Sequence, residues 1–263
     1  MFKKTALFLT ILLMVGCSTV PLTGRMQIAL VSDAEVLALS DTSYQSFMKT
    51  AVTSTKTVEN ARVTRVGKKI TTAVETYFTQ QGLSAQLAGY SWSFKLVKDE
   101  AVNAFCMPGG KIVVYEGLLP ITLDDTGLAV VVGHEIAHAV AKHSNERMSQ
   151  QLILNYGAST LSTVMSKKST AAKTIASTVF GLGAEYGVAL PYSRKQEYEA
   201  DRLGLIFMAM AGYDPAQSVA FWERMSAVSK SSTPEFLSTH PSDAKRIANL
   251  KILLPEAQAF YKK

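Results

Sequence analysis

Three residues near the middle of the chain have the types and the spacing of a metal-dependent hydrolytic site. His134 and His138 are four positions apart, and Glu135 lies between them. On a helix of about 3.6 residues per turn, side chains four apart lie about 40° apart in azimuth, so both imidazoles can reach one ion. Catalytic zinc takes three protein ligands and leaves a fourth position to water, from which Glu135 could accept a proton. The pattern predicts that His134 and His138 bind one zinc ion and that Glu135 is a general base.

The third ligand must come from another part of the chain. A metzincin would carry Gly and His at the positions where this chain has Ala141 and Ser144. His143 is one position out of that pattern and lies about 140° around a continuous helix from His138, so we interpret it as structural.

A better source of the third ligand is the segment from Ser193 to Asp201. Its acids Glu197 and Asp201 are four apart and share one face of a predicted helix. One carboxylate could bind the ion while the other orients a ligating histidine. Glu199 lies between them and is a weaker alternative.

The elements that position these residues form an α+β domain. Ser32 begins a helical pattern that runs to about Gln80, and Trp92–Val97 and Lys111–Tyr115 are strand candidates. The apolar segment Leu128–Ala141 predicts a buried helix that carries the histidine pair. A few strands beside several helices are typical of α+β folds.

Five motifs in the same order resemble the gluzincin peptidases that include the prenyl-protein (CaaX) endopeptidase and HtpX. They are Pro21–Arg25, Asn103–Gly110, His134–His138, Glu197–Asp201 and Thr239–Pro241. Because long membrane-spanning helices are absent from the pattern, the chain looks like the periplasmic lipoprotein branch with LoiP and BepA.

The resemblance implies a mainly helical zincin-type fold with a small sheet beside the helix of the histidine motif. It assigns Glu197 as the third zinc ligand and Asp201 as its outer partner. The segment that starts with Asn103, Ala104 and Phe105 is expected to supply an edge strand to which an extended peptide adds by main-chain hydrogen bonds.

His240 is the remaining histidine and precedes Pro241, which favours an extended or turn conformation at His240. Two active-site roles are open for it. Its imidazole could occupy the open zinc position when no substrate is bound, or it could donate a hydrogen bond to the oxyanion. A cap or packing role is the alternative.

The N-terminus has the order of a secretory signal. Lys3 and Lys4 precede a short apolar stretch, and Met14–Cys17 resembles the lipobox of bacterial lipoproteins. We therefore expect a lipoprotein signal peptide over residues 1–16, lipidation of Cys17, a tether over residues 17–31 and one metallopeptidase domain over residues 32–263. Ser18 favours the outer membrane, which places the chain in the bacterial periplasm.

Composition excludes some classes of function. The formal net charge is +6, but no basic run exceeds two residues, so nucleic-acid binding has little support. Cys106 is then the one cysteine left after Cys17 and is interpreted as a buried thiol. Residues 156–190, rich in Ala, Ser, Thr and Gly, are expected to form a helical insertion over the site.

Two functions are compatible with these patterns. The first is a zinc endopeptidase of the bacterial cell envelope that cleaves misfolded or membrane-associated proteins. Its partners would be protein or peptide substrates, outer-membrane lipid through the acylated N-terminus, and envelope assembly or protease proteins. The second is a latent, zinc-containing chaperone-like or binding module at the outer membrane. Glu135 favours the first, because a structural zinc site has no use for a general base.

Overall fold

The computed structural model describes residues 17–166, 175–176, 179–180, 192–228, 235–240 and 244–262. The predicted signal peptide, residues 1–16, lies outside these residues, as does most of the predicted insertion over residues 156–190. The fold class is confirmed: the described part is mainly helical with a small sheet. Its longer helices are α2 (Asp33–Thr50), α3 (Thr57–Gln80), α5 (Asp125–Val140), α6 (His143–Ser166), α8 (Arg194–Met210), α9 (Gln217–Val228) and α11 (Ala244–Gln258).

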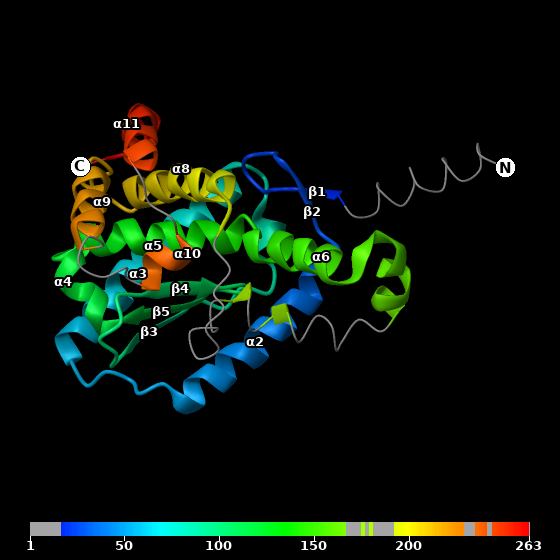
Figure 1. Cartoon of the computed structure of the whole chain (residues 1–263). Helices are drawn as coiled ribbons and strands as arrows, with labels where there is room; N and C mark the ends of the chain where they lie inside the picture. The colour runs from blue at the N-terminus through cyan, green and yellow to red at the C-terminus, as the bar shows by residue number, and fades with distance from the viewer. Residues whose placement is uncertain are drawn as a thin grey trace.

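Helix α5 is the centre of the fold and carries the histidine motif. It begins where the side chain of Asp124 accepts a hydrogen bond from the Gly127 amide at 2.8 Å, a typical N-cap. Its residues from Gly127 to Val140 are all buried. Figure 1 shows α5 between the sheet on one side and α8 on the other. A helix that is apolar all round requires such packing on every face.

The sheet beside α5 has three strands in the order β3-β5-β4. Strand β3 (Ser93–Val97) is parallel to β5 (Lys111–Tyr115), whereas β4 (Ala104–Met107) is antiparallel to it. The predicted strands at residues 92–97 and 111–115 correspond to β3 and β5. Because β5 is the central strand, β4 lies at an edge of the sheet. It also packs against α5.

The helical pattern expected from Ser32 to Gln80 is two helices, α2 and α3. Ser32 caps α2 by accepting a hydrogen bond from the Glu35 amide. The chain leaves the helical conformation at Ala51 because the next residues add to the sheet instead: Thr53 forms a bridge with Val97, and the Ser54 amide donates to the Leu96 carbonyl. Helical periodicity in the sequence did not reveal this sheet contact.

Residues 17–31, expected to be a tether, are partly folded onto the domain. Strands β1 (Cys17–Thr19) and β2 (Met26–Ile28) pair antiparallel, and β2 contacts α6. Val20 is 1% exposed and belongs to the main hydrophobic core. The segment is thus a docked hairpin rather than a free extended chain.

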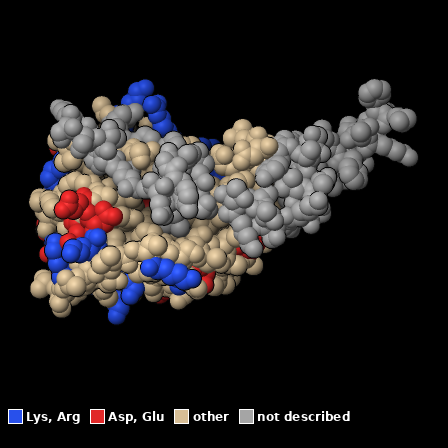
Figure 2. All heavy atoms as spheres, turned by 60° about the horizontal axis from the view of Figure 1, so that its bottom comes forward, with Lys and Arg blue, Asp and Glu red and all other residues tan. Residues whose placement is uncertain are grey.

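The remaining helical elements are short. They are η1 (Ser84–Leu87), η2 (Glu116–Leu118), α4 (Leu119–Thr122) and α10 (Glu235–Thr239). Within the described ranges, no helix combines the length and the apolar character needed to cross a bilayer. On the face shown in Figure 2, basic side chains form separate groups among uncharged and acidic ones.

Helices α5 and α8 approach closely at two glycines. A Cβ atom added to Gly204 would lie 2.9 Å from the His134 amide nitrogen and 3.0 Å from the Gly133 carbonyl carbon. The two backbones are therefore in contact at the turn of α5 that carries His134. This close approach lets the acids of α8 reach the histidines of α5.

We expect Gly204→Ala to lower the free energy of unfolding by about 1–3 kcal/mol, because the added methyl forces the two backbones apart. In a solvent-exposed helix, Gly→Ala would instead stabilise the fold by about 1 kcal/mol. The sign of the change in unfolding free energy therefore shows whether the backbones are in contact. Urea unfolding measures it. Lys195→Ala, at an exposed position of the same helix, is the control, and equal stability of the two variants would refute the packing argument.

Candidate metal centre

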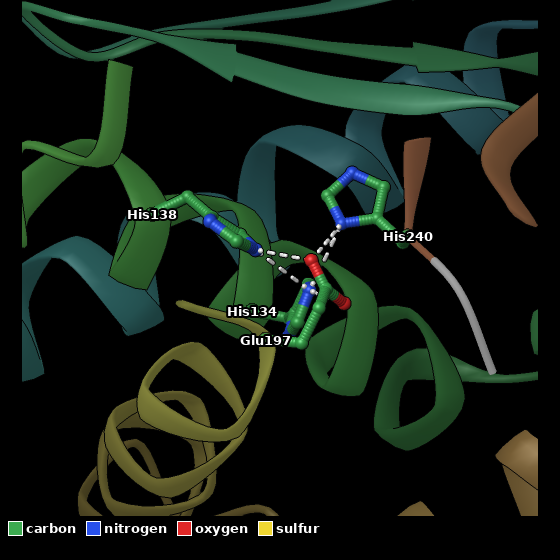
Figure 3. Close-up of side chains that lie close together, drawn as sticks. All are labelled: His134, His138, Glu197 and His240. Atoms are coloured by element: carbon green, nitrogen blue, oxygen red, sulfur yellow. Dashed lines mark hydrogen bonds and ion pairs between the residues drawn. The ribbon is translucent and has the colours of Figure 1, made fainter. Parts of the chain in front are cut away.

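Four side chains from three parts of the chain meet in the interior. His134 and His138 come from α5, Glu197 from α8, and His240 follows α10 directly. Each is buried, and one donor atom from each lies within 4.8 Å of the others. Figure 3 shows the three imidazoles converging on the carboxylate of Glu197. Glu199, the alternative third ligand, lies outside this cluster.

The distances between donor atoms place them around one common point. His138 Nε2 is 3.0 Å from His134 Nε2 and 3.3 Å from Glu197 Oε1. His240 Nδ1 is 3.2 Å from His134 Nε2 and 3.1 Å from Glu197 Oε1. Three imidazole nitrogens and a carboxylate oxygen are ordinary zinc ligands, and this arrangement fits one ion.

The outer nitrogen of His134 faces Asp201. His134 Nδ1 lies 3.0 Å from Asp201 Oδ1. When Nδ1 donates to this carboxylate, Nε2 keeps its lone pair for a metal, as in the carboxylate–histidine pairs of zinc sites. Asp201 follows Glu197 by one turn of α8, and its role as an outer partner of the centre stays a prediction.

The outer nitrogen of His138 faces His143, which we had interpreted as merely structural. The two Nδ1 atoms are 2.8 Å apart. The azimuth argument assumed one continuous helix and so did not anticipate this contact, although His143 stays outside the four-donor cluster. Instead α5 ends at Val140, Lys142 has a positive φ of 60°, and α6 begins at His143. The change in direction brings His143 back over His138.

Arg246, on α11, was not found from the sequence. It is 1% exposed and donates to both oxygens of Asp201 at 2.8 and 2.7 Å, while its Nη1 lies 2.7 Å from Glu197 Oε2. Its guanidinium also stacks on the ring of Trp222 at 3.6 Å. Because two buried carboxylates need a cation, the sequence indicated that some Lys or Arg must lie beside them. It did not indicate which of the many Lys and Arg residues supplies this charge.

Tyr192 was also not predicted from the sequence. Its ring lies 3.9 Å from that of His138 and 5.0 Å from that of His240, centroid to centroid. The guanidinium of Arg147 covers it at 4.0 Å. Tyr192 therefore fixes the faces of two imidazoles in the cluster. It lies next to a stretch outside the described residues, and nothing in its sequence context indicated this role.

The surroundings of the cluster favour the metal-binding forms of His138 and Glu197 but not that of His134. Burial lowers the pKa of His138 well below its ordinary value, so its imidazole is neutral. Burial raises the pKa of Glu197, but Arg246 and His240 outweigh this effect and hold that pKa well below the ordinary range. Burial and Arg246 lower the pKa of His134, whereas Asp201 and Glu197 raise it, to about 9 in the absence of metal. A proton and a metal ion thus compete for His134.

Glu135 differs from the other acid of the centre. Burial raises its pKa, and its Oε1 accepts no hydrogen bond among the described residues. His240 Nε2 lies 3.4 Å from Glu135 Oε1. Glu135 also lines a narrow cleft together with residues 103–108 of the edge strand, Tyr192 and His240. A buried carboxylate with a raised pKa beside a metal site has the properties of a general base.

Comparison with known proteins places this geometry in a family. The profile of Peptidase family M48 matches residues 59–253. The chain belongs to this family. Its membership confirms the predicted class, a zinc metallopeptidase, and, together with the four-donor cluster, the predicted zinc cofactor. This match does not distinguish branches within the family, so the assignment to a LoiP/BepA branch stays a prediction.

The relatives include eukaryotic and bacterial proteins. The chain is 31% identical to human "Metalloendopeptidase OMA1, mitochondrial" over 245 residues, 90% of this chain and 46% of the relative. It is 37% identical to the Schizosaccharomyces pombe "Mitochondrial metalloendopeptidase OMA1", over 65% of this chain and 49% of the relative. The Escherichia coli "Beta-barrel assembly-enhancing protease" is 29% identical over 60% of this chain and 33% of its own length. The chain thus spans at most about half the length of these M48 relatives.

The predicted location in the bacterial periplasm is contradicted, because relatives from yeasts, a plant and vertebrates are named as mitochondrial. The physical reason is that a short apolar stretch after two lysines is a weak address, since several sorting systems use positively charged N-terminal segments. Acylation of Cys17 stays a prediction.

We expect Arg246→Met to lower the free energy of unfolding of the metal-free chain by about 3–5 kcal/mol, because it leaves two buried carboxylates without their cation. Urea unfolding in the presence of a chelator measures this change. The matched control is Arg202→Met, which removes a half-exposed pair with Glu256 and should change stability by about 1 kcal/mol or less. Similar losses in both variants would contradict the assigned role of Arg246.

Proposed function

We propose that the chain is a zinc endopeptidase that hydrolyses peptide bonds with Glu135 as the general base. The observation that carries this proposal is the position of Glu135. Within the described residues, Oε1 of its buried carboxylate accepts no hydrogen bond, and the side chain lies beside the donor cluster and lines the cleft of the edge strand. A site that only stabilised the fold would not need this group.

The residues divide the chemistry between them. His134, His138 and Glu197 would hold the zinc ion, which when bound lowers the pKa of a water molecule to about 7 and polarises a carbonyl group. Glu135 accepts a proton from the attacking water and passes it to the leaving amine. Asp201 holds the proton on His134 Nδ1 and so fixes the tautomer of that imidazole.

Substrate would add to strand β4 as a further antiparallel strand. Asn103 accepts a hydrogen bond from the Tyr115 amide at 3.1 Å, so alternate residues of β4 pair with β5. The main-chain groups of Ala104 and Cys106 therefore face the open edge. The Ala104 amide already donates to the Asn103 side chain at 2.9 Å. Among the described residues, the Ala104 carbonyl and the main-chain N–H and C=O of Cys106 are left for a peptide.

Main-chain recognition suggests the class of substrate. An edge strand binds any extended segment with few demands on side chains, and folded proteins rarely expose such segments. We therefore propose misfolded or membrane-associated proteins as substrates. The name of the bacterial relative, an assembly-enhancing protease, is compatible with this class.

The centre also has features of a closed, resting state. His240 supplies a fourth donor, and the cleft beside it has a volume of only about 30 Å³, room for about two water molecules. Four protein donors are typical of structural zinc, and this favours the latent binding module as a second candidate. We propose instead that His240 closes the site at rest and moves aside for substrate, because its Nε2 also lies 3.4 Å from Glu135 Oε1 and the one side chain therefore covers both the donor cluster and the carboxylate.

We expect Glu135→Gln to keep its zinc content and stability but to lose peptide hydrolysis by several orders of magnitude, since the amide cannot accept the proton. Metal analysis and cleavage of casein, on one preparation, test both halves. Casein cleavage at the wild-type rate would remove Glu135 from the mechanism, and the latent-module reading predicts no casein cleavage by either protein.

For His240→Ala we expect faster removal of zinc by a small chelator and faster hydrolysis of short peptides, because the substitution opens the fourth position and frees Glu135. Both rates should be measured on the same protein. If His240 acts only as an oxyanion donor, turnover falls about 100- to 1000-fold while zinc removal is unchanged. The two mechanisms therefore predict changes of opposite sign in turnover.

A further inference from the structure

The turn between β1 and β2 packs beside the metal centre, although residues 17–31 were expected to be a tether. Arg25 donates to Glu199 Oε2 through Nε at 2.7 Å, and Thr23 donates to the other oxygen of Glu199. Arg25 also binds Glu146 through both terminal nitrogens, at 2.9 and 2.8 Å. These contacts join the N-terminal segment to α6 and α8.

Glu199 continues the connection inward. Its Oε2 lies 3.0 Å from His143 Nε2, and His143 Nδ1 lies 2.8 Å from His138 Nδ1. The His143 side chain is 0% exposed and that of Glu199 only 7%. A continuous series of hydrogen bonds therefore runs from Arg25 and Thr23 to a ligand of the metal centre.

The protons along this series have one consistent assignment. If His138 offers the Nε2 lone pair to a metal, its proton is on Nδ1 and is donated to His143 Nδ1. His143 must then carry its own proton on Nε2 and donate it to Glu199. The carboxylate accepts this bond together with those from Arg25 and Thr23. Each donor meets an acceptor, and the pattern holds His138 in its metal-binding tautomer.

The turn is held in place by features that a simple tether does not need. Leu22 has a φ of 72°, a conformation unusual for a non-glycine residue, and Gly24 has a φ of 69°. Val20 and Leu22 pack against the main core. This anchoring presents Thr23 and Arg25 to Glu199 with a fixed geometry, and a strained non-glycine residue persists only where its surroundings hold it.

We propose that Thr23 and Arg25 are positioning residues of the metal centre, acting through Glu199 and His143 on His138. His134 has a direct carboxylate partner in Asp201, whereas His138 obtains its carboxylate through an intervening imidazole. The N-terminal hairpin completes this second arm. Displacement of the hairpin from the domain therefore weakens metal binding, which links the state of the N-terminus to the activity of the site.

This inference rests on the zinc centre but not on the proposed hydrolysis, so zinc affinity is the readout. We would measure it on the whole chain by competition with a chromophoric chelator. His143→Phe should weaken zinc binding by about 10- to 100-fold, the usual range for an outer partner of a ligand. Arg25→Met should weaken it by about 10-fold, because its effect is transmitted through Glu199.

The double variant tests whether the residues act in series. In Arg25→Met/His143→Phe, the loss should equal that of His143→Phe alone, since the connection is already broken. If the two losses multiply, the residues act independently and the proposal is wrong. A zinc affinity of Arg25→Met equal to that of wild type would also refute it.

Matched variants separate positioning from general stability. Arg65→Met removes another bidentate Arg–carboxylate pair, with Asp125 of the same metal-bearing helix, and should leave zinc affinity unchanged. Arg25→Lys keeps a charge near Glu199 but cannot bridge to Glu146 in the same geometry, so it should bind zinc with intermediate affinity. If Arg25→Met does not fold, Thr23→Val tests the same connection through Glu199. We expect a smaller loss of zinc affinity in this variant, and an unchanged affinity would refute the proposal.

Discussion

Burial of charge is the constraint on which the rest of this structure depends. Glu197 and Asp201 are 1% and 3% exposed, in the same interior as four buried histidines. Carboxylates in such a place are stable only with a compensating cation and a complete set of hydrogen bonds. Arg246 supplies a permanent positive charge, and the stacking of its guanidinium on Trp222 holds that charge in place. The α9 and α11 helices therefore belong to the centre as much as the histidine helix does.

The close approach of α5 and α8 follows from the same constraint. Acids on α8 can reach imidazoles on α5 only if the helices touch at their backbones, and Gly133 and Gly204 permit this contact. The sheet covers the opposite side of α5 and provides an open edge beside Glu135. The donor cluster, the Glu135 carboxylate and the open edge of β4 are thus positioned by one helix that packs on both sides.

The two histidines that α5 contributes to the donor cluster are supported in different ways. Asp201 contacts His134 directly from the neighbouring helix, within the buried core. His138 lies at the end of α5, where the chain turns, and its support passes through His143 and Glu199 toward the surface. The first arm is inseparable from the core, whereas the second ends in a hairpin near the N-terminus. The two imidazoles thus depend on different parts of the chain, one on the core and the other on the docked N-terminal hairpin.

Local spacing was sufficient to predict part of this protein. The positions of His134, Glu135 and His138 on one helix, the pairing of Glu197 with Asp201, and a sheet with helices all follow from periods of 3.6 and 2 residues, which any chain obeys. Tertiary structure decided the rest. His143 meets His138 only because the helix breaks at Lys142, Arg246 reaches the acids from a distant helix, and Arg25 docks from the N-terminus. These contacts join residues far apart in sequence or across a break in a helix, and no periodic pattern encodes which buried carboxylate a given arginine will find.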